Sequence, residues 1–161
     1  MRFRYLQPLY GFGPDLTHVA VPHVAEEKLL EMAHDLVGSD DLVAIYIPEG
    51  TEEVYRPGNR RGRVAGAVQL VPMPDGGGIS DYFFRDWDDS LRWPIGWPCR
   101  VVYAPPVEEC PVLRSIVDAV HGPNSFQPYV SRLQKGPFVM DRKVADKLEA
   151  WFARFSTLSD H

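Results

Sequence analysis

The segment from Trp93 to Tyr103 constrains the fold of this chain most, because it combines two tryptophans, two prolines and a short run typical of a β-strand. Proline fixes its own φ angle, lacks a backbone N–H and disfavours helix in the residue before it, so the segment cannot begin as a helix. Its end, Val101–Tyr103, is β-branched and aromatic and predicts a strand. We therefore expect Trp93 and Trp97 on a stiff, non-helical lead-in to that strand.

Two interpretations of these tryptophans are open. Rigid aromatic side chains at the start of a strand suit flat ligands with a π face, such as nucleobases. Alternatively, Trp93 and Trp97 pack in the hydrophobic core, because most tryptophans in folded proteins are largely buried. The sequence of the segment does not decide between a ligand contact and a core position.

The composition bounds the possible functions. The 161 residues suffice for a single domain, 1–161, with an N-terminal arm over residues 1–16. No apolar run approaches the length of a membrane span, so we expect a cytoplasmic protein with no membrane partner. The net charge of −5 argues against non-specific wrapping of a duplex, which needs a broad basic surface. That charge is compatible with a pocket that reads a single base.

Hydrophobic periodicity, caps and chain breakers predict an α+β fold. We expect strands near 17–21, 42–47, 64–72 and 99–104, and helices near 24–37, 111–121 and 141–156. Asp141 is the expected N-cap of the last helix, which would bury Trp151. We interpret residues 79–92 as a long loop and residues 125–139 as a mixture of strand-like and turn segments.

The N-terminal arm is unusually aromatic. Its large apolar residues include Phe3, Tyr5, Leu9, Tyr10 and Phe12. Exposed together, they would form a sticky patch, so we expect most of them to be buried. The arm would then pack on the domain itself or on a second copy of the chain in a homodimer.

Candidate catalytic groups are sparse. Asp86, Asp88 and Asp89 could hold a hard cation, although acidic residues in such loops are mostly solvated. His18 and His23 share no helical face, and the two cysteines form no CxxC motif, so we expect reduced thiols. The chain has neither a nucleophile elbow nor a phosphate-binding glycine loop. We therefore expect no cofactor, no catalytic residue and no metal ligand, and a binding protein rather than an enzyme.

Four short motifs follow one another along the chain: Asp41–Tyr46, Gly62–Val68, Arg92–Val101 and Arg132–Phe138. With an acidic, aromatic loop between the second and the third, they resemble the EVE domain of the PUA-like superfamily, a relative of the YTH domain. The resemblance extends from about Leu42 to Phe155. It implies a curved, partly closed mixed β-barrel flanked by helices. It also implies binding of nucleic acids with modified bases, one base being captured in an aromatic pocket.

Individual positions carry this resemblance. Trp93-Pro94 and Pro98-x-Arg100 match the Trp-Pro and Pro-x-Arg elements that lead into a strand of the family. Val64-Ala65-Gly66 matches the strand whose glycine lies beside the pocket. Gly136-x-Phe138 matches the turn before the last helix.

Taken together, these features predict a non-catalytic module that binds a modified base or nucleotide in DNA or RNA. The expected ligand-binding residues are Trp93, Trp97 and Tyr46 around the main cleft, with Arg100, Ser131 and Arg132 as polar contacts to a base edge or a phosphate. Two alternatives stay open. One is a metal-dependent hydrolase or nuclease on the same scaffold, and the other is a protein–protein interaction domain that uses its aromatic arm and loop.

Overall fold

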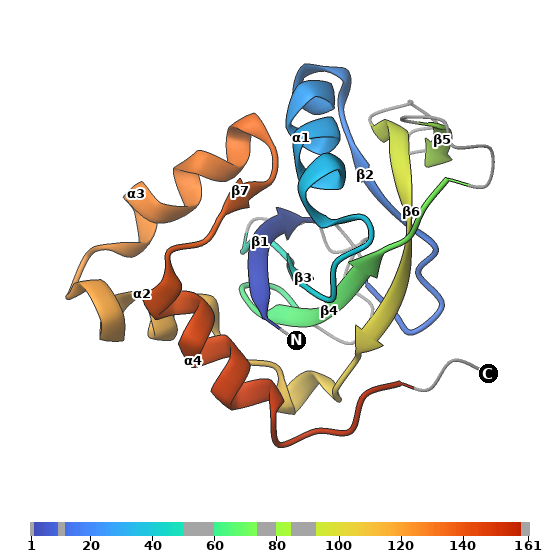
Figure 1. Ribbon diagram of the computed structural model, residues 1–161. Coiled ribbons are helices and arrows are strands. Elements are labelled where there is room, and N and C mark those ends of the chain that lie inside the picture. Colours follow the sequence, from blue (N-terminus) through green and yellow to red (C-terminus); the bar gives the residue numbers. More distant parts are fainter. Residues whose placement is uncertain (1, 10–11, 50–59, 74–79, 85–92, 159–161) are drawn as a thin grey trace.

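The computed structural model describes residues 2–9, 12–49, 60–73, 80–84 and 93–158 and has an α+β fold, as the sequence predicts (Figure 1). Its strands are β1 (Phe3–Pro8), β2 (His18–Val21), β3 (Leu42–Tyr46), β4 (Val64–Leu70), β5 (Ser80–Phe84), β6 (Trp93–Tyr103) and β7 (Phe138–Val139). Its α-helices are α1 (Glu26–Leu36), α2 (Leu113–His121), α3 (Phe126–Val130) and α4 (Arg142–Phe152). Short 3₁₀ helices are η1 (His23–Ala25), η4 (Val107–Glu109) and η5 (Ser131–Lys135).

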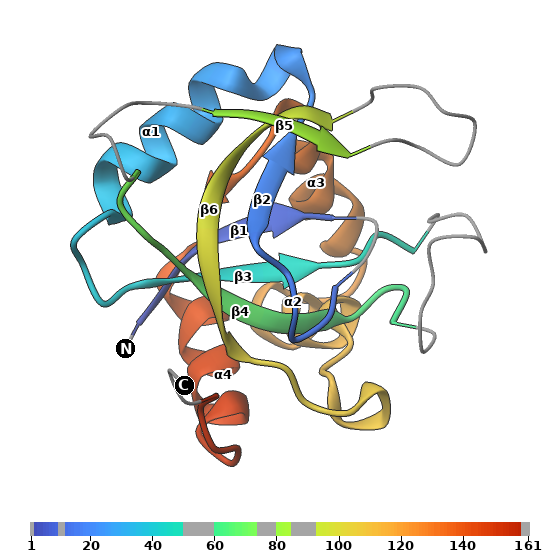
Figure 2. The same cartoon turned by 90° about the vertical axis from the view of Figure 1, so that its right-hand side faces the viewer.

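The strands join into a curved, mixed sheet (Figures 1 and 2). Their order is β2-β6-β4-β3-β1-β7, and β5 pairs with β6 as well. β1 and β3 run parallel, whereas the other pairs of this sheet are antiparallel. The end strands β2 and β7 do not pair with each other in the residues described, so the sheet is open and a closed barrel is not confirmed.

Hydrophobic clusters cover both faces of the sheet, because successive side chains of a strand point to opposite faces. In β3, Val43 and Ile45 belong to the cluster that also contains α1. Leu42, Ala44 and Tyr46 belong to the cluster that contains α2, α3 and α4. All five residues of β3 are buried, which explains why this strand is a continuous apolar run in the sequence. Figure 1 shows the sheet between α1 and the α2–α4 pair.

The N-terminal arm is part of the sheet rather than an appendage. β1 pairs in parallel with β3 and antiparallel with β7, so it is an inner strand. Phe3, Tyr5 and Phe12 are buried, as expected, with exposed fractions of 2%, 8% and 5%. Tyr10 lies outside the described residues. Since the three aromatic side chains are buried within their own chain, they are not exposed for contact with a second copy.

β6 begins at Trp93 and includes both prolines, so the expected strand near 99–104 starts earlier than predicted. β2 pairs with one side of β6, where Pro98 is in register with His18, and the prolines are tolerated because the partner on the other side changes from β5 to β4. Pro98 lies between Gly96, the last residue to pair with β5, and Cys99, the first to pair with β4. Pro94 lies opposite the irregular part of the β5 pairing. A missing N–H costs little at such interruptions of a hydrogen-bond ladder.

Two further expectations are corrected. Residues 80–84 of the expected long loop form β5, which pairs with β6, while 85–92 lie outside the described residues. Residues 126–135 are helical instead of strand-like, in α3 and η5. In this segment Phe126, Tyr129 and Leu133 recur at helical spacing and are buried against the α2–α4 cluster. Burial of this face overrides the strand preference of the aromatic and β-branched residues.

The remaining elements agree with the sequence to within a few residues. β2, β3 and β4 lie where strands are expected, and η1 with α1, α2 and α4 lie where helices are expected. Asp141 is the N-cap of α4, and its carboxylate accepts a hydrogen bond from the backbone N–H of Val144 at 3.4 Å. Trp151 is half-buried rather than central, and it packs at the edge of the core. Within the described residues no helix has the length and apolar character needed to cross a bilayer.

Candidate functional site

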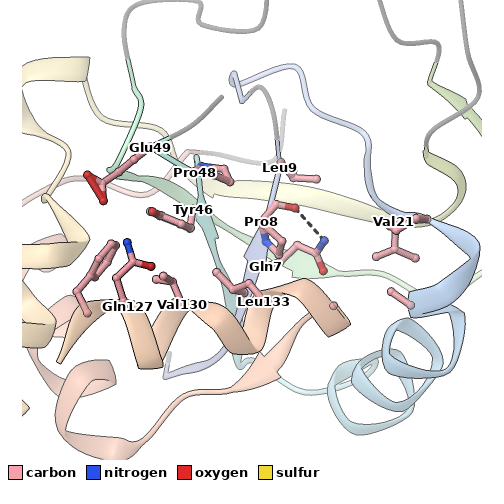
Figure 3. Close-up of a pocket in the computed structure, with 14 residues that line it drawn as sticks. Gln7, Pro8, Leu9, Val21, Tyr46, Pro48, Glu49, Gln127, Val130 and Leu133 are labelled. Atoms are coloured by element: carbon pink, nitrogen blue, oxygen red, sulfur yellow. Dashed lines mark hydrogen bonds between the residues drawn. The ribbon is translucent and has the colours of Figure 1, made fainter. Parts of the chain in front are cut away.

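A cavity of about 480 Å³ opens between the end of β2 and the ends of β1 and β3 (Figure 3). β1 and β3 are parallel, so both end at this edge, where Pro8 is in register with Tyr46. The end of β2 with η1 forms the opposite wall, and α3 with η5 forms the floor in the view of Figure 3. The cavity volume falls in the range typical of sites for small molecules.

The lining is mainly apolar and comes from distant parts of the chain. β1, β3 and the residues after them contribute Gln7, Pro8, Leu9, Tyr46, Pro48 and Glu49. α3 and the following segment contribute Phe126, Gln127, Val130, Leu133 and Gly136. β2 and η1 contribute Val21, Pro22 and Ala25. Such a set, with a few polar groups among apolar side chains, is typical of a binding pocket.

Two aromatic rings form one wall. The rings of Tyr46 and Phe126 meet edge to face, with centroids 6.4 Å apart and an interplanar angle of 78°. Burial, reinforced by the charge of Glu49, raises the pKa of the Tyr46 phenol to about 12. The phenol therefore stays neutral at physiological pH and keeps its O–H as a possible donor.

An ion pair holds the rim beside this wall. The guanidinium of Arg114 lies over the Phe126 ring at 4.4 Å and donates a 2.6 Å hydrogen bond to the Glu49 carboxylate. Both partners are close to half exposed, so their attraction is screened by water and adds little to stability. Their position instead gives the cavity one carboxylate at its entrance.

Gln7 is a polar residue of the lining, and it is completely buried. Its Nε2 donates to the carbonyl of Pro8 at 3.1 Å and to that of Ala20 in β2 at 3.3 Å. The amide thereby bridges β1 and β2 where no backbone pairing joins them. Its Oε1 accepts no hydrogen bond from any of the described residues.

Gly136 closes the lining on the η5 side for a steric reason. Its φ of +105° is unfavourable for residues with a Cβ. A Cβ at this position would also lie 2.8 Å from the Cβ of Ala25 in η1. Glycine therefore lets η5 approach η1 closely enough to complete the cavity.

Of the residues expected in the site, Tyr46 lines the cavity and Trp97 does not. Trp97 is 6% exposed and packs in the cluster with α1, on the face of the sheet opposite to that of Tyr46. Its indole Nε1 donates to the carbonyl of Val71 at 2.7 Å. The structure thus favours the core interpretation of this tryptophan. The backbone of Trp93 pairs with Phe84, and its side chain lies outside the described part of the structure.

The expected polar contacts lie apart from one another. Arg100 is exposed on β6 and donates to the Gln69 amide oxygen across the sheet, and it does not line the cavity. Ser131 and Arg132 are exposed on η5, two residues and one residue before the lining residue Leu133. The Ser131 hydroxyl donates to the Pro128 carbonyl, and the Arg132 guanidinium lies 4.1 Å from the centre of the Phe138 ring.

Groups for the catalytic alternative are not gathered in the described residues. Asp86, Asp88 and Asp89 lie outside them, and the rest contains no cluster of three or more histidine, cysteine or acidic side chains able to hold a metal. Burial raises the pKa of the Cys99 thiol to about 12, and it also raises that of Cys110. Both thiols are therefore protonated and poorly nucleophilic at neutral pH.

Sequence reasoning missed most of the lining. Phe126, Val130 and Leu133 were not expected in the site because the segment that holds them was read as strand and turn, not helix. One signal is present at Gln7, a polar residue between Leu6 and Pro8.

No family model, curated protein or solved structure matches this chain.

Proposed function

We propose that the chain is a non-catalytic module that binds a modified nucleobase or nucleotide, in DNA or RNA, in the cavity beside Tyr46. The observation that carries the proposal is a largely apolar cavity of about 480 Å³ with an aromatic wall and a few polar groups. A flat, uncharged ring with a polar edge is the kind of ligand that such a lining would hold. The rings of Tyr46 and Phe126 offer it apolar and edge-to-face contacts.

The surroundings of the cavity are compatible with a base that remains attached to its strand. Arg132 and Lys135 project from η5, beside the lining residues Leu133 and Gly136. The Arg132 guanidinium lies over the Phe138 ring, and this contact restrains it. Its N–H groups point along the guanidinium plane and stay available for a phosphate. In our proposal, these cations contact the backbone and the cavity holds the base.

We further propose that the fold is that of a PUA-like EVE domain and that the protein works in the cytoplasm. The curved mixed sheet flanked by helices supports the first proposal. The two free cysteines support the second, because thiols stay reduced in the cytosol.

Binding of short oligonucleotides tests the function. Single-stranded DNA and RNA 12-mers would each carry one 5-methylcytosine, 5-hydroxymethylcytosine, N6-methyladenine or unmodified base, and their dissociation constants would be measured by fluorescence anisotropy. We expect at least one modified base to bind more tightly than its unmodified counterpart. The variant Val130→Trp, which fills the cavity with an indole, should weaken that binding at least tenfold, or about 1.4 kcal/mol.

The matched control is Val24→Trp, the same substitution on η1 at a side chain that is 82% exposed and does not line the cavity. It should leave both binding and melting temperature unchanged. If no oligonucleotide binds, or if Val130→Trp binds as well as the wild type, the proposed function is wrong.

A further inference from the structure

The amide of Gln7 is the least expected feature of the cavity. It is fully buried on an inner strand of the sheet, and yet its Oε1 accepts no hydrogen bond within the described structure. Buried acceptors without a partner are rare in native proteins because they lose their hydrogen bonds to water and gain none in return. This oxygen therefore calls for a partner that the chain itself does not supply.

The orientation of the amide is fixed by its neighbours. The two N–H groups of Nε2 are directed to two backbone carbonyls, those of Pro8 and Ala20. Turning the amide over would place its oxygen against these carbonyl oxygens, acceptor against acceptor. Oε1 must therefore face away from Pro8. In Figure 3 it points between the side chains of Leu133 and Val21, both of which line the cavity.

A second acceptor of the lining, the Glu49 carboxylate, also favours a ligand that donates hydrogen bonds. The Glu49 carboxylate at the rim accepts hydrogen bonds and donates none. Its negative charge is shared with Arg114 but still disfavours an anionic group at that edge. A ligand that presents N–H donors and no negative charge fits these two acceptors.

We infer that the cavity selects a flat, uncharged ligand by an N–H donor, which hydrogen-bonds to Gln7 Oε1. This inference rests on the proposed function and specifies its ligand: a base that keeps at least one N–H on its polar edge. Oε1 is shielded from bulk water, so Leu133 or Val21 changes rotamer as the donor enters. Such side-chain adjustments are common on binding. Methylation of a base at carbon is tolerated, whereas methylation that removes the last N–H is rejected.

Isomeric nucleosides separate the effect of the N–H donor on binding from the effect of ligand size. Three pairs suffice: 5-methyluridine with 3-methyluridine, N4,5-dimethylcytidine with N4,N4-dimethylcytidine, and 2,N6-dimethyladenosine with N6,N6-dimethyladenosine. Within each pair the atoms are the same in number, and only the first isomer keeps an N–H on its base. Isothermal titration with the wild-type protein should show, for the pair that binds, at least tenfold tighter binding of the N–H isomer.

The variant Gln7→Met removes the acceptor at nearly constant side-chain length, and it should reduce this ratio to within twofold of one. Gln69→Met is its matched control, since Gln69 lies on strand β4, donates from its Nε2 to the backbone carbonyl of Ser39 at 3.0 Å and does not line the cavity. It should retain the ratio of the wild type. Melting curves of both variants show whether the loss of the bridge to Ala20 unfolds the protein.

Each outcome is decisive. Equal binding of the two isomers by the wild type overturns the inference and leaves the proposed function standing, whether or not Gln7→Met folds. An unchanged ratio in a folded Gln7→Met protein overturns it as well, as does a ratio lost in Gln69→Met. If no nucleoside of the three pairs binds while the modified 12-mers do, the inference about the N–H donor is wrong and the proposed function is kept. If neither class binds, both proposals fail.

Discussion

At the scale of single residues, two tryptophans of the described structure donate from their indoles to backbone carbonyls, and they differ in burial. Trp97 donates to Val71 from within the core, and Trp151 donates to Glu109 at the surface, at 2.7 and 2.8 Å. The indole N–H is the only polar group of tryptophan, so phenylalanine keeps an aromatic ring and loses the bond. The cost of that loss depends on whether water can reach the carbonyl left behind.

Trp97→Phe should therefore lower the free energy of unfolding by about 1–3 kcal/mol, the cost of a buried polar group without a partner. Trp151→Phe should cost less than about 1 kcal/mol, because water can solvate the Glu109 carbonyl. Urea denaturation monitored by circular dichroism measures both. A stable Trp97→Phe protein that no longer binds the 12-mers would contradict the core assignment and return Trp97 to the binding site.

The phenol of Tyr46 makes a separate contribution that depends on pH. Its pKa is raised from 10.0 to about 12 in the folded protein, mainly by burial. A raised pKa stabilises the fold below the unfolded value of 10, and this stability is lost as the pH rises towards 12. Between pH 9 and 11, the free energy of unfolding of the wild type should fall by about 1.4 kcal/mol more than that of Tyr46→Phe.

Urea midpoints of the two proteins at pH 9 and pH 11 give this difference. The raised pKa of Cys99 acts on both proteins alike and cancels in the comparison. Parallel pH dependence of the wild type and Tyr46→Phe would mean that the phenol is solvated, contrary to its place in the wall.

At the scale of elements, the candidate site depends on β1. It lies between β3 and β7 in the sheet and brings Gln7 and Pro8 to the cavity. Leu6 in this strand is fully buried, in the cluster that contains α2, α3 and α4. β1 is therefore as much a part of the core as the apolar strand β3.

Leu6→Ala should lower the free energy of unfolding by about 2–5 kcal/mol, as expected for a large cavity in a core. Leu30→Ala is the same substitution on α1 at a side chain that is 45% exposed, and it should change stability by no more than about 0.5 kcal/mol. Urea denaturation measures both changes. If Leu6→Ala lowered the free energy of unfolding as little as Leu30→Ala, residues 3–8 would not be integrated in the sheet.

The elements also show what the sequence can predict. The apolar run of β3, the period of α4 and the Asp141 cap are local signals, and each element is found where its signal lies. α3 was missed because its aromatic and β-branched residues favour strand locally, and only contact with α2 and α4 makes it helical. β1 was missed as a strand because parallel pairing with β3 leaves no hairpin turn in the sequence.

At the scale of the whole molecule, the site is a consequence of incomplete closure of the sheet. β2 and β1 approach each other at one edge, and the Gln7 amide joins them in place of a backbone ladder. The cavity occupies this opening, and its walls come from segments more than a hundred residues apart in sequence. Tyr46 is expected at the site from the sequence, but the partners that surround it depend on tertiary packing.

Binding of a base in this opening can be observed by NMR of the ¹⁵N-labelled wild-type protein. Titration with the six isomeric nucleosides and the modified 12-mers would be followed by the backbone amides and the side-chain NH₂ groups of glutamine. We predict that the largest shifts occur at Gln7, Tyr46 and Val130, and that Arg100 and Trp97 remain unaffected. Shifts centred on Arg100 and Trp97, or no shift with any of these ligands, would contradict the account.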